Sequence, residues 1–567
     1  REVRHLHLDI YYRPMLPVNA QMENDQIVLS VEAAQERFES IGFGDPDAAI
    51  RHVQALTAGV GRAAKINRII LPAVLQWLGE GQNPDMGLLN WRKLEENFGT
   101  ESGYLGFLRD STSAAQRLCH ILSNSRFLGD ALNKSVESIS WLGDDDNLQA
   151  RTREALDVQT GSALERFGSN INEFATSMRA MRRHEIERIG LSWMSGVISD
   201  SDSLKAMTDV YDAIIDASLT WAVRHQIAEF GVETAPAGIA MGRYGGREVN
   251  FSSDADAILI YRPADDADDG QANAFAKKVV EDLRNILQGP TTLEPKIELD
   301  LDLRPEGKNG PLVRSYASCE EYYESWASTW ERQALLRARY AAGDAELARD
   351  FLINIADPLR YPTTELTEAE LQNIRKLKAR MEAERLPRGV RRERHLKLGK
   401  GGLSDVEWTV QLMQLQHAGD IKDLRVNGTL EALDVLEAKK LISAIDAIQL
   451  RKAWTLCTAA RNGSYLWSGR ANQADILPDD IYSLGGIAVY LGYGAHRGQH
   501  FENDLLAVMR KCRDVCQRLF YGKTEGEAAA ATTATASAAT QQPQTAPRPR
   551  MHVIAPRLER NRRRAQR

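Results

Sequence analysis

Residues 242–261 read GRYGGREVNFSSDADAILIY, and this stretch decides the fold of the chain. Residues 255–261 have the apolar character of a buried strand, and residues 237–241 predict another strand before the Gly-rich turn. Asp254 and Asp256 stand two residues apart where the strand begins, so its period of two places both carboxylates on one face. Such a pair repels unless divalent cations lie between the carboxylates, and oxygen-only ligands favour Mg²⁺. The stretch therefore predicts a magnesium site at the start of this strand.

A second acidic strand is predicted further along the chain. Residues 296–304 alternate strictly between apolar and polar side chains, which is the pattern of a half-buried strand. Asp300 on the polar face can be the third carboxylate of a site in which two ions about 3.5–4 Å apart clamp the oxygens of a phosphoryl displacement. Asp302 shares that face and could take the same role. The glycines of the Gly245-Gly246 turn lack a Cβ, so backbone amides there can approach a phosphate closely.

Helical patterns surround this α/β region on both sides. Helix-start signals precede it at residues 45–47 and 83–85, where Asp or Asn can cap and proline is tolerated at the first helical position. The sequences at residues 367–370 and 404–407 fit capping boxes. The sequence therefore predicts a mainly α protein with an embedded α/β domain.

The two ends of the chain differ from its middle. Residue 1 is Arg rather than Met, and residues 1–13 echo residues 510–522, as the tail of an earlier copy of the same architecture would. From Lys523 the composition changes to Ala, Thr, Gln and Pro, with arginines at the end, which is typical of disorder. The predicted segments are a tail of a preceding half at 1–29, a helical linker or regulatory region at 30–184, the α/β domain at 185–345, a helical bundle at 346–522 and a disordered low-complexity tail at 523–567.

Composition and charge exclude several classes of protein. The 567 residues carry a formal net charge of −7 and a pI of about 6.0, which does not favour a nucleic-acid-binding domain. No apolar stretch is long enough to span a bilayer, and no leader opens the sequence. Five cysteines in so long a chain are not a disulfide framework, so we expect reduced thiols in a cytoplasmic protein. The charge and the lack of a long apolar stretch predict neither nucleic-acid nor membrane partners.

Four motifs in order resemble those of the glutamine synthetase adenylyltransferase family. The family signature is Gly-Lys-Leu-Gly-Gly-x-Glu-Leu-x-x-Ser-Ser-Asp-x-Asp, and residues 242–256 depart from it mainly in Arg243 and Tyr244, which replace Lys-Leu. Residues 299–305 resemble Val-Asp-x-Arg-Leu-Arg-Pro, which ranks Asp300 above Asp302 because arginine is common at the latter position. The remaining blocks are Trp-Glu-Arg-Gln-Ala-Leu at 330–335, and Lys397 with Gly-Gly-Leu-Ser-Asp-Val-Glu at 401–407.

The resemblance implies a polymerase β-type nucleotidyltransferase domain flanked by helical bundles. It also implies Mg²⁺-dependent transfer of AMP from ATP to a tyrosine of glutamine synthetase by the carboxy-terminal, adenylylating half of a bifunctional enzyme. The implied partners are glutamine synthetase and a PII-type signalling protein. The expected catalytic and metal ligands are Asp254, Asp256 and Asp300, and the expected ATP-binding residues are Gly245, Gly246, Ser253, Arg304 and Lys397.

Two other functions remain open at this point. The phosphorolytic, adenylyl-removing half would use the same aspartates, so the site does not exclude it. A non-catalytic module that docks glutamine synthetase or a PII-type protein has no need of three clustered acids. Other polymerase β relatives, which act on RNA ends or small antibiotics, fit the Asp-x-Asp pair but not the flanking blocks or the acidic pI.

Overall fold

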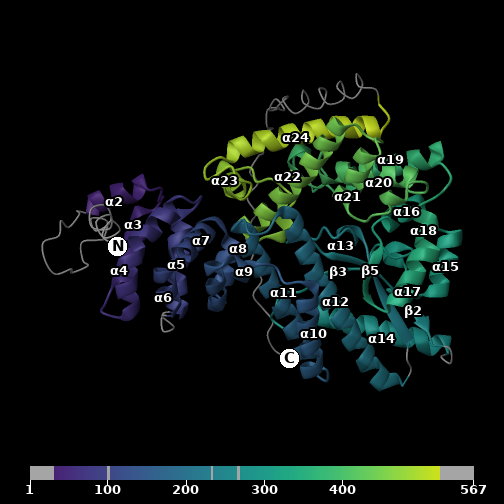
Figure 1. Ribbon diagram of the computed structural model, residues 1–567, viewed down its shortest axis with the longest axis horizontal. Helices are drawn as coiled ribbons and strands as arrows, with labels where there is room; N and C mark the ends of the chain where they lie inside the picture. Colours follow the sequence, from purple (N-terminus) through teal and green to yellow (C-terminus); the bar gives the residue numbers. More distant parts are fainter. Residues whose placement is uncertain are drawn as a thin grey trace, which may run out of the picture.

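The computed structural model describes residues 31–98, 103–231, 234–264, 268–290, 292–387 and 389–523. This part of the chain is mainly helical with a small mixed sheet, which confirms the predicted fold class (Figure 1). The predicted tail of a preceding half at 1–29 and the low-complexity tail beyond Lys523 lie outside the described residues. None of the described helices combines the length and the hydropathy that a membrane span requires.

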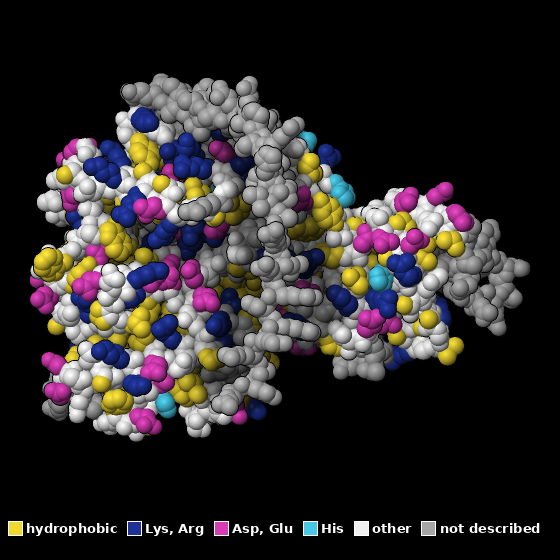
Figure 2. Space-filling view, turned by 180° about the vertical axis from the view of Figure 1, so that it is seen from behind, with side chains coloured by type: hydrophobic (Ala, Val, Ile, Leu, Met, Phe, Trp, Pro, Cys, Tyr) yellow, Lys and Arg dark blue, Asp and Glu magenta, His cyan; other side chains and the backbone are white. Residues whose placement is uncertain are grey.

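Helices occupy the chain from Val31 to Phe230, and the first of them form a lobe that projects from the larger body (Figures 1 and 2). The Asp45 carboxylate caps α3 by accepting a hydrogen bond from the Ala48 amide at 2.9 Å, as the sequence predicts. The predicted boundary at residue 185 lies within α11, and the domain limits remain predictions. The elements are α2 (Val31–Ser40), α3 (Pro46–Thr57), α4 (Arg62–Gly79), α5 (Pro84–Phe98), α6 (Gly103–Asp110), α7 (Thr112–Asn124), α8 (Arg126–Leu132), η3 (Val136–Gly143), α9 (Asp145–Leu148), α10 (Arg153–Phe167), α11 (Ile171–Met194) and α12 (Asp200–Phe230).

The sheet follows α12 in the order β3-β2-β1-β5, with β4 also paired to β2. Strand β1 is antiparallel to β2 and β5, whereas β3 and β4 run parallel to β2. The strands are β1 (Thr234–Ala240), β2 (Ala255–Pro263), β3 (Leu299–Asp300), β4 (Val313–Ser315) and β5 (Arg339–Gly343). The helices of this region are α13 (Gly242–Gly245), α14 (Asp269–Gln288), η4 (Gly307–Asn309), α15 (Tyr316–Ser325), α16 (Thr329–Leu335), α17 (Ala345–Asp350), η5 (Phe351–Ala356) and α18 (Asp357–Arg360).

Alternate residues of β2 enter two different hydrophobic cores. Ala257 and Leu259 join the large core that contains residues of α11, α12 and α14. Ile258 and Ile260 join a smaller core with residues of α15 and α17 on the other face of the sheet. Both faces are therefore covered, which explains why β2 reads as a continuous apolar run rather than an alternating one.

The predicted strand at residues 296–304 is much shorter in the structure. Only Leu299 and Asp300 pair with β2 as a strand. The chain then turns, because the Asp302 amide donates to Asp300 Oδ1 at 2.7 Å and the Arg304 amide donates to the Leu301 carbonyl at 3.2 Å. The alternating pattern therefore predicts the position of the strand but not its end.

The C-terminal helices pack over the α/β domain and contact the N-terminal lobe (Figure 1). Thr367 and Glu370 form the predicted capping box of α19. The capping box predicted at residues 404–407 is wrong, because α20 begins after Gly402 without a side-chain cap. The elements are α19 (Glu368–Glu384), η6 (Arg392–Arg394), α20 (Leu403–His417), η7 (Lys422–Leu424), α21 (Thr429–Ala438), α22 (Ala444–Ser468), η8 (Ala471–Gln473), α23 (Ile481–Tyr490) and α24 (Gly498–Leu519).

A buried ion cluster joins α19, α20 and α24. Lys378 is fully buried and contacts the carboxylates of Asp405 and Glu382. Arg513 Nη1 lies 2.9 and 3.0 Å from the two Asp405 oxygens. Burial raises the pKa of Asp405, but the charges of Lys378 and Arg513 outweigh this effect and lower the pKa to about 2. Asp405 is therefore a structural anion at the centre of the helical bundle.

Replacing Lys378 by methionine is expected to lower the free energy of unfolding by about 3 kcal/mol, because the substitution leaves a buried carboxylate with one cation instead of two. Urea unfolding of the full chain, followed by tryptophan fluorescence, measures the loss. Arg380→Met on the same helix is the control, since the Arg380–Glu384 pair is exposed to solvent and contributes little to stability. Equal unfolding midpoints for the two variants would contradict this account.

Candidate functional site

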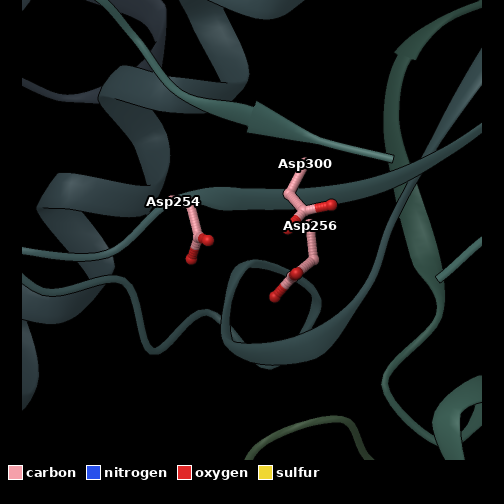
Figure 3. A group of neighbouring side chains, drawn as sticks. All are labelled: Asp254, Asp256 and Asp300. Carbon is pink, nitrogen blue, oxygen red and sulfur yellow. The ribbon is translucent and has the colours of Figure 1, made fainter. Parts of the chain in front are cut away.

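Three aspartates meet at the edge of the sheet where β2 and β3 begin. Asp254 directly precedes β2, Asp256 belongs to β2, and Asp300 is its register partner in the parallel strand β3. One carboxylate oxygen from each lies within 4.8 Å of the other two. Figure 3 shows Asp254 and Asp256 directed to the same side of β2, with Asp300 beside Asp256 on the neighbouring strand. The structure thus brings together the three predicted metal ligands, with Asp254 exposed and the other two half-buried.

Gly242 fixes the position of Asp256. The Met241 amide donates to the Asp256 carbonyl at 2.8 Å, which joins β1 to the start of β2. Gly242 follows with φ +52°, and a Cβ at this position would lie within 3.0 Å of Asp256 Oδ2. A glycine is therefore required here both by the backbone conformation and by the approach of the carboxylate.

The electrostatics of the triad favour a cation. Burial, together with the charges of Asp254 and Asp300, raises the pKa of Asp256 to about 7, although Lys397 and Arg243 act in the opposite direction. A divalent cation between the carboxylates would remove this repulsion, and three carboxylates form the hard oxygen set that Mg²⁺ prefers. The residues of the site therefore fit the predicted metal.

The raised pKa predicts a pH dependence of metal binding. Below a pH of about 7 a protonated Asp256 must lose its proton before it can bind Mg²⁺, whereas above that pH it is already ionised. Lowering the pH from about 8 to about 6 is expected to weaken Mg²⁺ binding roughly tenfold. Calorimetric titration with MgCl₂ at both pH values measures the change in affinity. The Asp302→Asn variant is the control and is expected to show the same pH dependence as the wild type. Equal affinities at the two pH values would contradict the assignment of Asp256 as a ligand.

Asp302 has a different environment from Asp300. Its carboxylate lies 3.1 Å from Lys308 Nζ and 3.6 Å from Arg304 Nη1. Its backbone amide donates to the Asp300 carboxylate at 2.7 Å, which helps to orient that side chain. The geometry therefore supports Asp300 over Asp302 as the third ligand.

The predicted phosphate-binding turn is packed against protein. The Gly245 and Gly246 amides donate to the carbonyls of Met241 and Gly242, and a Cβ on either glycine would collide with Arg337. This geometry gives the two glycines a packing role. The Ser253 hydroxyl lines the cavity described below but donates to Asn250 Oδ1 at 2.7 Å. Direct phosphate contacts of Gly245, Gly246 and Ser253 remain predictions.

A cavity of about 1010 Å³ opens in front of the triad. It is lined by all three aspartates and by two predicted cations, Arg304 and Lys397. The Arg304 guanidinium donates from all three nitrogens to the carbonyls of Gly310, Leu301 and Lys308, at 2.9, 2.8 and 3.0 Å, so it holds the loop after β3. No hydrogen bond of Lys397 Nζ occurs within the described residues, which leaves this ammonium available to a ligand.

Sequence reasoning missed several residues of the cavity wall. Arg243 Nη2 lies 2.8 Å from Glu407 Oε1, and Arg461 Nε contacts Asp475. All four residues line the cavity with the triad. The position of Arg243 inside the Gly-rich turn was a usable signal, but nothing local marks Arg461, because only tertiary packing brings it to the site.

Two other acidic residues of the sequence motifs have structural contacts. Glu331 caps α16 through Ser328 and accepts a hydrogen bond from the Tyr322 hydroxyl at 2.8 Å. Glu248, within the Gly-rich motif, accepts from the Thr429 hydroxyl at 3.0 Å at the start of α21. The Glu331 contacts lie within the α/β domain, whereas the Glu248–Thr429 contact links that domain to the C-terminal helices.

Comparisons with known proteins agree with this geometry. A family model described as glutamate-ammonia ligase adenylyltransferase matches residues 115–354, which include the sheet and the triad. A second model, described as GlnD PII-uridylyltransferase, matches residues 373–520 in the C-terminal helices.

Three curated relatives share one name, bifunctional glutamine synthetase adenylyltransferase/adenylyl-removing enzyme. The relative from Bifidobacterium longum subsp. infantis is 98% identical over 100% of this chain and 53% of its own length. The relative from Leifsonia xyli subsp. xyli is 42% identical over 93% of this chain and 52% of its own length. The relative from Streptomyces coelicolor is 41% identical over 92% of this chain and 53% of its own length. The chain thus spans about half the length of the curated relatives it matches.

Proposed function

Because the chain belongs to the glutamine synthetase adenylyltransferase family of nucleotidyltransferases, we propose that it transfers AMP from ATP to a tyrosine of glutamine synthetase in a Mg²⁺-dependent reaction. The observation that carries the proposal is the meeting of Asp254, Asp256 and Asp300 at one wall of a cavity large enough for a nucleotide. Such a reaction would inactivate glutamine synthetase in the cytoplasm as part of nitrogen regulation.

In this proposal the three aspartates hold Mg²⁺. Bound Mg²⁺ would neutralise charge on the phosphates and make the nucleophile easier to deprotonate. The tyrosyl oxygen of glutamine synthetase attacks the α-phosphorus of ATP, and Asp300 accepts its proton. The bond between the α-phosphorus and the bridging oxygen breaks, and its electron pair leaves with pyrophosphate. Lys397 offsets the charge that develops on this leaving group.

The reverse assignment is a second candidate, because the name of the relatives includes adenylyl removal. An adenylyl-removing half would use the same triad, with a phosphate oxygen attacking the AMP-tyrosine to release ADP. Transfer is preferred here because residues 330–335 resemble the version of that block in the adenylylating half. The helical region at 30–184 is proposed as a linker or regulatory region, and a PII-type protein is proposed as a regulator.

A paired assay tests the direction of the reaction. One arm gives the chain unmodified glutamine synthetase, Mg²⁺ and ATP, and measures AMP bound to the synthetase by the gain in mass of its tyrosine peptide. The other arm gives it adenylylated synthetase, Mg²⁺ and orthophosphate, and measures ADP release. Activity in the first arm alone supports transfer, and activity in the second arm alone assigns removal. Absence of both activities would favour a non-catalytic docking module.

A further inference from the structure

A cluster of three cations lies beside the aspartate triad and comes from three distant parts of the chain. Arg243 belongs to the short helix α13, Lys397 to the loop before α20, and Arg461 to α22. All three line the cavity that also contains the triad. Arg243 and Lys397 both act on the carboxyl group of Asp256, lowering its pKa, so the cluster lies next to the metal ligands.

The two arginines have buried N–H groups that no atom of the described residues accepts. Arg243 is 10% exposed and uses Nη2 on Glu407, while its Nε and Nη1 are buried without a hydrogen-bond partner among the described residues. Arg461 is 5% exposed, and its Nε contacts the Asp475 carboxylate. Its Nη1 is buried and has no hydrogen-bond partner among the described residues. A buried donor left unpaired costs about 1–3 kcal/mol, so these donors indicate a missing acceptor.

One cation of the cluster has no ion-pair partner. Arg243 pairs with Glu407 and Arg461 with Asp475, whereas no carboxylate of the described residues forms an ion pair with Lys397. Burial and the neighbouring charges of Arg461 and Arg243 lower the pKa of Lys397. An ion network that served only to join helices would pair all its charges, so the unpaired ammonium and the unpaired N–H groups point to an additional anion.

We propose that Arg243, Lys397 and Arg461 form a phosphate-binding subsite beside the aspartate triad. Arginine N–H groups match the oxygens of a phosphate, and the ammonium of Lys397 adds a point charge. The subsite rests on the proposed function. It adds to that function the residues that hold the phosphate group which leaves, or attacks, the α-phosphorus. That phosphate is the departing pyrophosphate in AMP transfer, or the attacking orthophosphate in AMP removal.

Binding of pyrophosphate and of orthophosphate to the full chain tests the subsite without any turnover. Each ligand is titrated calorimetrically in Mg²⁺, without glutamine synthetase, against the wild type and the Arg461→Gln and Lys397→Met variants. We expect each variant to bind the preferred ligand about 10- to 100-fold more weakly, as the loss of one charge-assisted contact predicts. Lys397→Met breaks no ion pair of the described residues, so it keeps the test informative if Arg461→Gln does not fold. Arg470→Gln is the matched control, because Arg470 is exposed beyond the end of the same helix and does not line the cavity.

The outcomes separate the subsite from the proposed function. Tighter binding of pyrophosphate, lost in the variants, supports the subsite as the place of the leaving group. Tighter binding of orthophosphate, lost in the variants, supports the subsite and assigns it to the removal reaction. The assignment of the subsite would be overturned if both variants bound the ligands as tightly as Arg470→Gln does. It would also be overturned if the wild type bound neither ligand. Failure to label glutamine synthetase despite intact subsite binding would instead count against the proposed function alone.

Discussion

Replacing Asp256 by asparagine is expected to slow AMP transfer by about 10³-fold or more, because it removes a charged metal ligand at the centre of the triad. The fold is expected to remain intact. Asp256 carries a pKa raised to about 7 by burial and by its two acidic neighbours, so a neutral side chain of the same shape relieves repulsion. The initial rate of synthetase modification and the thermal midpoint of the same preparation are the two measurements needed.

Asp302→Asn is the matched control for this substitution. Asp302 lines the same cavity but pairs with Lys308 and lies outside the group of three that can share an ion. Its loss is expected to change the rate by less than about tenfold, as for a group outside the metal shell. If Asp302→Asn were as damaging as Asp256→Asn, or if Asp256→Asn kept full activity, the assignment of the triad would be wrong.

Replacing Gly242 by alanine is expected to have a similarly large effect, although no functional group is removed. The new Cβ would lie within 3.0 Å of Asp256 Oδ2, so the carboxylate must move away from its partners. A displacement of about 1 Å in a catalytic group can cost about 100-fold in rate, and we expect at least that loss together with weaker Mg²⁺ binding. Calorimetric titration with MgCl₂ and the modification assay measure the two effects.

The control for Gly242→Ala is Gly469→Ala at the end of α22. Gly469 has φ +70°, close to the φ of +52° at Gly242, but nothing lies within 4 Å of its Cβ position. The two variants therefore share the backbone strain of about 1 kcal/mol and differ only in the contact with Asp256. Equal activity of both variants would show that Gly242 acts only through backbone conformation.

Much of the fold follows from short-range patterns in the sequence. The apolar runs at residues 237–241 and 255–261 predicted β1 and β2, because a strand covered on both faces must be continuously apolar. The strand at 296–304 was predicted too long, since its alternation continues into a turn that is closed by hydrogen bonds of Asp302 and Arg304. The alternation of apolar and polar residues does not show where such a turn ends the strand.

Only part of the candidate site could be predicted from the sequence. The spacing of Asp254 and Asp256 predicted one acidic face, and the resemblance placed Asp300 beside it, as the register of β2 and β3 has it. The cation cluster could not be predicted as a unit, because Arg461 reaches the site only through the packing of α22. Glu407 was interpreted as part of a capping box, yet it is the ion-pair partner of Arg243.

The proposed catalysis of AMP transfer by the three aspartates is tested most directly by incubating the chain with α-labelled ATP, Mg²⁺ and glutamine synthetase, and comparing the wild type with Asp254→Asn. We expect label on a tyrosine of the synthetase with the wild type, and a rate at least about 100-fold lower with the variant. Labelling of the synthetase by Asp254→Asn as fast as by the wild type would contradict a catalytic role of the triad.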